Sequence, residues 1–170
     1  MTLSVCMMMT MYPTVYFNTT GAIMKEKELQ KLKKDALIML LKEKMTASKP
    51  NDIVTYVKNN VVFDWNVENL ILVILNASSQ ILSTEIISIG TINKSLVSIP
   101  YIFRQIFLCP KSYAFVLLHN HPSGNINPSD EDNQITRKLK ESSNLMGIEM
   151  VDHIIITELD YYSYNSNAQM

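Results

Sequence analysis

The chain has 170 residues, of which 47% are hydrophobic and 18% charged, with 15 basic against 16 acidic side chains. A chain of this length can bury about 70% of its unfolded surface, so a core can form without disulfides or a structural metal. The net charge of −1 removes the simplest argument for a nucleic-acid or membrane-surface protein. With only two cysteines the chain cannot be organised by a disulfide framework. We therefore expect the protein to be located in the reducing cytoplasm. The longest apolar run, Leu70 to Leu75, is far shorter than the ~20 residues of a membrane span.

Residues 1–23 lack the features of a folded segment. They are rich in Met, show no apolar periodicity, and contain Pro13 where a signal peptide needs an unbroken apolar region. We expect them to be disordered or to reflect a misassigned start, since Met24 opens a more regular segment. Residues 24–49 are predicted to form a helical extension, because Leu29, Leu32 and Leu40 recur at helical spacing between lysines and glutamates.

The helical extension and the rest of the chain differ in charge. Residues 25–49 carry eight lysines against four acids, whereas residues 50–170 carry seven basic and twelve acidic side chains. A basic helix on an acidic domain can contact nucleic acid, but a solvated helix face is the more frequent explanation of such a charge run. Charge therefore identifies no partner.

Residues 50–170 are predicted to form one α/β domain in which helices pack on a sheet. Along this part of the chain the apolar residues change from helical spacing to β-rich runs, and Pro, Gly and Asn mark the ends of the elements. The predicted elements are a short helix capped by Asn51 or Asp52 and ending at Asn60, a hairpin of strands 68–75 and 81–89, a helix between Pro100 and Pro110, a strand over 114–118, a helix from the Ser129 cap to Met146, and strands over 150–157 and 161–164.

Two of the three histidines, His119 and His121, stand two residues apart at the end of the predicted strand 114–118. Positions i and i+2 of an extended chain face the same side, so both imidazoles can converge on one point. Asp132 lies in the first turn of the next helix, where its carboxylate can be aimed back at the strand end. Two imidazoles and one carboxylate, with a fourth position left for water, make up a catalytic zinc site. We therefore predict one bound Zn²⁺.

The third histidine, His153, follows Asp152 within the predicted strand 150–157. Neighbouring residues of a strand point to opposite faces, so these two side chains cannot both face the metal. We therefore expect each to make a structural hydrogen bond outside the site.

The run His119-Asn-His-Pro-Ser-Gly124, with Pro128-Ser129 and Asp132 and then Asp152-His153-Ile-Ile-Ile, resembles the RadC-type family, a bacterial branch of the JAMM (MPN+) metallopeptidase superfamily. The resemblance covers roughly residues 51–164. It implies a JAMM/MPN-like fold of the cytidine-deaminase-like kind, with a mixed sheet flanked by helices. Longer family members carry an N-terminal helix-hairpin-helix domain, and this sequence resembles a short form without it.

The resemblance also implies roles for particular residues. The family's zinc ligands correspond to His119, His121 and Asp132, its motif serine to Ser129, and its acid/base glutamate to Glu68. From the residues alone Glu85 is a rival, because both acids would lie at one end of the hairpin if Leu70 paired with Glu85. Ser129 is expected to cap the helix and to donate to the oxyanion that forms on the attacked carbonyl.

Residues and resemblance together predict a zinc-dependent hydrolase of the JAMM type, a metallopeptidase or isopeptidase acting on a peptide or isopeptide. The alternative is a DNA-repair or mobile-element accessory protein, or a nuclease, on the same metal fold. An apolar groove beside the zinc would favour a peptide, whereas a basic surface would favour nucleic acid.

A chain that begins at Met24 should melt at the same temperature as the full chain, because residues 1–22 offer neither apolar periodicity nor caps. Thermal unfolding followed by circular dichroism measures this. A melting temperature lower by several degrees would show that the N-terminal residues stabilise the fold.

Overall fold

The computed structural model describes residues 16–17, 23–24, 30–35, 46–90 and 98–170, and the larger of its two sheets has five strands. The chain divides into two compact units, Met1–Leu41 and Lys42–Met170, which we describe separately. In the first unit, Tyr16–Phe17 (β1) pairs antiparallel with Ile23–Met24 (β2), a pair that the sequence did not predict, and residues 30–35 are helical. The remaining residues of the segment 1–23, and residues 25–29 and 36–45 of the predicted helical extension, lie outside the described residues. Residues 46–49 of that extension are not helical, and Thr46 forms an isolated antiparallel bridge with Gln80.

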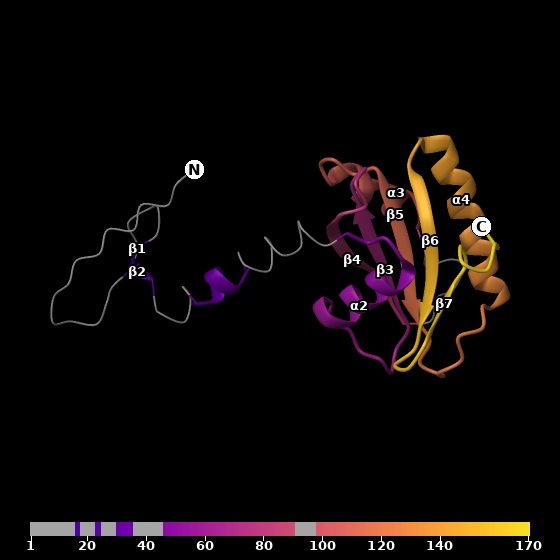
Figure 1. Ribbon diagram of the computed structural model, residues 1–170, viewed down its shortest axis with the longest axis horizontal. Helices are drawn as coiled ribbons and strands as arrows, with labels where there is room; N and C mark the ends of the chain where they lie inside the picture. Colours follow the sequence, from indigo (N-terminus) through magenta and orange to yellow (C-terminus); the bar gives the residue numbers. More distant parts are fainter. Residues whose placement is uncertain (1–15, 18–22, 25–29, 36–45, 91–97) are drawn as a thin grey trace. The chain divides into compact units, whose positions relative to one another are not determined.

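The second unit contains the sheet and its helices. In chain order its elements are α2 (Pro50–Asn60), β3 (Asn69–Leu75), β4 (Ile81–Ile89), α3 (Ile99–Leu108), β5 (Ala114–Asn120), α4 (Asp130–Met146), β6 (Glu149–Ile156) and β7 (Tyr161–Ser163) (Figure 1). The strands lie in the order β4-β3-β5-β6-β7, with β5 and β6 parallel and the other neighbours antiparallel. This mixed sheet confirms the predicted α/β fold class.

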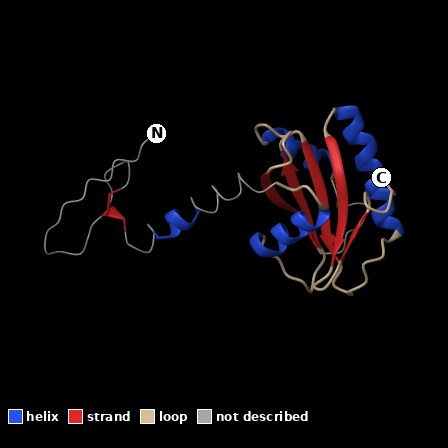
Figure 2. Cartoon of the chain, in the orientation of Figure 1, coloured by secondary structure: helices blue, strands red, loops and turns tan. Residues whose placement is uncertain are grey.

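Helices flank the sheet, whose strands Figure 2 shows side by side in red. On one face, α2 packs against Val116 and Leu118 of β5, and on the other face, α3 and α4 pack around Phe115 and Leu117. Every residue of β3 and β5 is buried, which explains why the apolar runs of these two strands are almost unbroken. None of the helices in the described ranges has the length and apolar character needed to cross a membrane.

The start of α2 differs from the prediction. Lys49 is the N-cap and Pro50 the first helical residue, so Asn51 and Asp52 both lie inside the helix. Asp52 still stabilises the helix start, because its Oδ2 accepts hydrogen bonds of 3.0 Å from the backbone nitrogens of Ser48 and Lys49. The proline explains the shift, since a first helical residue needs no N–H partner.

The register of the β3–β4 hairpin also differs from the one we considered. Leu70 lies opposite Ser88, whereas Glu85 pairs with Leu72. Two β-bulges in this strand pair each add one residue on β4 and thereby move the pairing along the strand. The uniformly apolar sequence of β3 has no alternation from which these bulges could be predicted.

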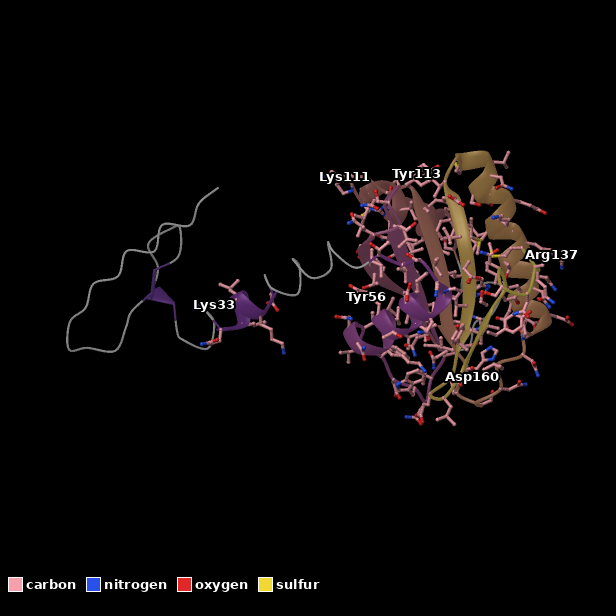
Figure 3. The ribbon with its side chains drawn as sticks, viewed as in Figure 1. Lys33, Tyr56, Lys111, Tyr113, Arg137 and Asp160 are labelled. Atoms are coloured by element: carbon pink, nitrogen blue, oxygen red, sulfur yellow. The ribbon has the colours of Figure 1, made fainter. Side chains whose placement is uncertain are left out.

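The C-terminal ends of β5 and β6 lie at the same edge of the sheet because the two strands are parallel. Figure 3 labels Tyr113, which precedes β5, at one end of the sheet and Asp160, which follows β6, at the other. β5 extends two residues further than predicted, through His119 and Asn120. The first motif histidine is therefore part of the sheet, at the end marked by Asp160.

A pair of buried asparagines holds the loop before β3 against this end of β5. Asn120 Oδ1 accepts hydrogen bonds from the backbone nitrogen and the Nδ2 of Asn69, at 2.8 and 3.0 Å, and Asn120 Nδ2 donates to the Val67 carbonyl at 2.9 Å. Asn69 Nδ2 also donates to the carbonyls of Val67 and Asp64. The backbone on both sides of Glu68 is thus fixed by this asparagine clamp.

Asn120→Ala should lower the free energy of unfolding by about 1–3 kcal/mol, because it leaves buried polar groups without their partner. Urea unfolding measures this loss. Asn66→Ala is the matched control, since Asn66 is an exposed residue of the same loop and should change the free energy by less than about 0.5 kcal/mol. Equal losses in the two variants would contradict a clamping role for Asn120.

Candidate metal centre

Two imidazoles meet at the C-terminal end of β5. His119 and His121 share the face of the sheet that α4 covers, because they alternate with Asn120, and their Nε2 atoms are 3.0 Å apart. His119 is fully buried, whereas 14% of the His121 side chain is exposed. The pair therefore consists of an inner ring in the core and an outer ring that reaches the surface.

The loop after β5 orients the outer ring. His121 Nδ1 is 2.6 Å from the Asn125 carbonyl oxygen, which can only accept a hydrogen bond, so Nδ1 carries the proton. The neutral ring then has its lone pair on Nε2, the atom that faces His119. Gly124 turns the chain with a φ of +76°, a conformation that suits a residue without Cβ. The Pro-Ser-Gly turn thus brings the Asn125 carbonyl back onto His121.

Asp132 adds a carboxylate to the two rings. Its Oδ1 is 3.2 Å from His119 Nε2, and its Oδ2 is 3.5 Å from His121 Nε2. Ser129 donates to Oδ2 from its backbone nitrogen at 2.8 Å and from its hydroxyl at 2.6 Å. The Ser129 oxygen also accepts from the Asp132 backbone nitrogen at 3.1 Å, which completes a capping box at the start of α4. The predicted helix cap is therefore confirmed, and it orients the carboxylate.

The charges of these groups depend on one another. Burial alone would raise the pKa of Asp132, but the imidazoles of His119 and His121 beside it and the hydrogen bond from Ser129 together hold this pKa far below its usual value. The hydrogen bond with Asp132 raises the pKa of His121, against a smaller opposing effect of burial. The carboxylate thus stays ionised and favours a positive charge, either a proton or a metal ion, between the rings.

Of the two glutamates that the sequence left open, Glu68 is the one that approaches the histidines. Its Oε1 is 3.9 Å from His121 Nε2, and one ligand atom each of Glu68, His119 and His121 lie within 4.8 Å of one another. Glu85 pairs with Leu72, which is four residues after Glu68 and therefore about 13 Å from it along the strand, at ~3.3 Å per residue. Its side chain is exposed on the edge strand β4, away from the site.

The arrangement of the donor atoms fits a metal ion such as zinc. In a tetrahedral site with Zn–N bonds of about 2.0–2.1 Å, neighbouring ligand atoms are about 3.3 Å apart. The Nε2 atoms of His119 and His121 are separated by 3.0 Å, and His119 Nε2 and Asp132 Oδ1 by 3.2 Å. Electron-rich atoms at these distances repel one another unless a proton or a metal ion lies between them.

His153 reaches the centre from β6, which corrects the expectation that it makes a structural hydrogen bond outside the site. Its Nε2 is 3.0 Å from His119 Nδ1, and its Nδ1 is 2.6 Å from Thr136 Oγ1. The ring is fully buried, and burial lowers the pKa of His153 well below the ordinary value. The available signal was the order strand, helix, strand, which makes β5 and β6 parallel neighbours whose side chains meet.

Asp152 faces away from His153, as the strand alternation predicts. Its carboxylate accepts a hydrogen bond of 2.5 Å from the Ser163 hydroxyl and one of 3.0 Å from the Asn165 backbone nitrogen. Asp152 therefore has the predicted structural role, and it anchors the residues that follow β7.

A shallow depression of 420 Å³ opens beside the outer ring. It is lined by Glu68, His121, Pro122, Ser123, Asn125, Asn127, Pro128 and Ser129. All but Glu68 come from the segment between β5 and α4, so this one loop provides most of the surface that a ligand would contact. The lining residues include neither lysine nor arginine.

The sequence of the chain is similar to those of known proteins. The model of the family described as "RadC-like JAB domain" matches residues 47–169. A "UPF0758 protein" of Chlorobium chlorochromatii is 35% identical over 117 residues, which are 69% of this chain and 52% of that protein. Proteins of the same name are 35% identical over 128 residues in Pelodictyon phaeoclathratiforme (75% of this chain, 56% of that protein) and 42% identical over 97 residues in Alkaliphilus metalliredigens (57% and 41%). The chain spans about half the length of these curated relatives.

In the metal-free chain, His121 should titrate above the ~6.5 of an ordinary histidine, and Asp132→Asn should lower this pKa, because burial then acts without the carboxylate. The ring C2 proton, followed by NMR against pH, measures both. Asp130→Asn is the control, since it removes an exposed charge from the same helical turn.

The raised pKa of His121 also predicts how the free energy of unfolding depends on pH. Because the folded chain binds the His121 proton more tightly than the unfolded chain, the contribution of His121 to the free energy of unfolding should be largest below pH ~6.5 and should fall as the pH rises through the folded pKa. The lowered pKa of His153 contributes with the opposite sign, so the His121 contribution is measured as the pH-dependent difference in urea unfolding between the wild type and Asp132→Asn. A His121 titration that is unchanged in Asp132→Asn would contradict this coupling.

Proposed function

We propose a hydrolytic function on one premise: the chain belongs to the RadC-like JAB domain family, which is related to the JAMM metallopeptidases. Membership confirms the resemblance found in the sequence. The proposed activity is metal-dependent hydrolysis of an amide or isopeptide bond. The observation that carries it is the convergence of His119, His121 and Asp132 on one point, with Glu68 beside them.

We assign His119, His121 and Asp132 as the metal ligands. Asp132 lies nearer to the two rings than Glu68 does, and only 3% of its side chain is exposed, against 20% for Glu68. A zinc ion bound by these ligands would lower the pKa of a water molecule to about 7 and polarise a substrate carbonyl.

Glu68 is the proposed proton carrier. Its carboxylate accepts a proton from the attacking water and delivers it to the nitrogen of the leaving amine. Glu68 Oε1 lies 3.9 Å from His121 Nε2, which is beyond hydrogen-bond length but close enough for an ion pair when the ring is protonated. The asparagine clamp supports this role, because it fixes the backbone that presents Glu68.

Ser129 has two proposed roles. It orients Asp132, and it lines the depression in which a substrate would bind. As negative charge develops on the attacked carbonyl, the Ser129 hydroxyl can turn from Asp132 to this oxygen. The backbone nitrogen of Ser129 keeps its own hydrogen bond with Asp132 Oδ2 during that change.

The lining of the depression argues against a nucleic acid as the substrate, although most of its residues are polar and it is not the apolar groove that would favour a peptide. A nuclease needs cations near the phosphates, and the lining offers amides, hydroxyls, prolines and the acidic Glu68. The alternative of a nucleic-acid-binding accessory protein is supported by Lys31, Lys33 and Lys34, which are exposed on the helical residues 30–35.

We propose a cytoplasmic location for the protein. The free thiol of Cys109 fits this location, because the cytoplasm keeps thiols reduced.

The purified chain should contain one zinc ion per molecule, because one set of three convergent ligands is present at the end of β5. Elemental mass spectrometry of the desalted protein measures the ratio. His121→Ala should lose the metal, and Ser123→Ala, which changes another residue of the depression, should keep it. Undiminished zinc in His121→Ala would refute the ligand assignment.

Glu68→Gln should reduce turnover by about 10²–10⁴-fold, since it removes the base and keeps the shape of the side chain. Its zinc content should equal that of the wild type. Turnover is measured on peptide, isopeptide and DNA substrates, with Glu85→Gln as the matched control that should change little. If Glu68→Gln leaves the turnover of every cleaved substrate unchanged, then the glutamate-assisted mechanism is wrong.

A further inference from the structure

A line of buried hydrogen bonds leads from His119 into α4. His119 Nδ1 is 3.0 Å from His153 Nε2, and His153 Nδ1 is 2.6 Å from Thr136 Oγ1. Thr136 Oγ1 is in turn 2.6 Å from the backbone carbonyl oxygen of Asp132. All four residues are at most 2% exposed, so their polar atoms must find partners within the protein and not in bulk water.

The direction of the protons along this line is set by the Asp132 carbonyl. A carbonyl oxygen only accepts, and two oxygens 2.6 Å apart repel unless a proton lies between them. Thr136 therefore donates its single hydroxyl proton to Asp132. The Thr136 oxygen is then left to accept a hydrogen bond from His153, so His153 Nδ1 carries a proton.

His153 in turn determines which ring nitrogen of His119 carries the proton. Its ring stacks on Tyr164, with the centroids 5.0 Å apart and 7° between the planes, and its two nitrogens contact Thr136 and His119. A fully buried ring without a carboxylate against either nitrogen is neutral. With its proton on Nδ1, His153 has a lone pair on Nε2, which accepts the proton of His119 Nδ1.

We propose that Thr136 and His153 are positioning residues that hold the proton of His119 on Nδ1, so that Nε2 is presented to the metal. A free neutral histidine favours the other tautomer, with its proton on Nε2, and the line of hydrogen bonds reverses that preference. His121 obtains the same tautomer directly from the Asn125 carbonyl. The inference rests on the proposed metal site but not on hydrolysis.

The tautomers can be read in the metal-free chain with ¹⁵N-labelled histidine. Long-range ¹H–¹⁵N NMR spectra, recorded above the ordinary histidine pKa of ~6.5, distinguish a protonated from an unprotonated ring nitrogen. In the wild type we expect protonated Nδ1 on both His119 and His153. Thr136→Val keeps the shape but removes the acceptor for His153 Nδ1, so both rings should move their protons to Nε2. Thr136→Ser, which keeps the hydroxyl, should retain the wild-type pattern.

Zinc affinity, measured by competition with a coloured chelator, provides the second readout. Thr136→Val should bind zinc about 10–100-fold more weakly, the usual effect of losing the outer partner of a metal ligand, and Thr136→Ser should restore the affinity. Ser143→Ala is the matched control. It removes another buried hydroxyl of α4, which bonds to the Lys140 carbonyl at 2.8 Å, and should change neither affinity nor tautomers.

Two results would overturn the inference: a wild-type His119 with its proton on Nε2, or a Thr136→Val variant that retains both tautomers and the zinc affinity. Failure of the metal site gives a different result. A wild type with the expected tautomers that binds no zinc would support the line of hydrogen bonds and contradict the proposed metal centre.

Discussion

The alternation of side chains at the end of β5 is the constraint on which the site depends. His119 and His121 face α4 while Asn120, between them, faces α2. The histidines supply two ring nitrogens to one point, and the asparagine holds the loop that carries Glu68. One strand end therefore positions both imidazoles and the acid beside them, provided that the strand remains extended through residue 120.

The first turn of α4 completes the centre by the same chemistry that begins the helix. Ser129 and Asp132 satisfy the free backbone N–H groups of the helix start, and their hydrogen bonds also aim the carboxylate at the two rings. Thr136, one turn later, lies on the same side of α4. The groups around the rings are thus held by a strand and a helix, which position side chains more accurately than loops do.

The sequence predicts the parts of this structure whose causes are local. The His-x-His spacing on a strand end, the capping box and the succession of strands and helices each depend on neighbouring residues, and they place His119, His121, Ser129 and Asp132 at one site. The choice between two glutamates required the register of a hairpin, which two bulges determine. These bulges have no signature in the apolar run of β3.

The contact between His153 and His119 cannot be predicted from neighbouring residues, because it depends on which strands pair. Alternation along β6 correctly separates His153 from Asp152, but it does not say which of them faces the imidazoles of His119 and His121. That follows from the parallel pairing of β6 with β5 and from the helix packed above them. Packing between elements distant in the sequence, not any local pattern, makes His153 part of the centre.

The C-terminal residues have a consequence for the strength of these interactions. Asp152 accepts hydrogen bonds from Ser163 and Asn165, and so fixes the turn that lays the Tyr164 ring flat on His153. Tyr164 is 1% exposed, its hydroxyl donates to Asn133 at 2.9 Å, and burial raises its pKa. The Tyr164 ring keeps bulk water away from His153. The charges and dipoles around His119 therefore interact through a medium of low dielectric constant, which strengthens these interactions.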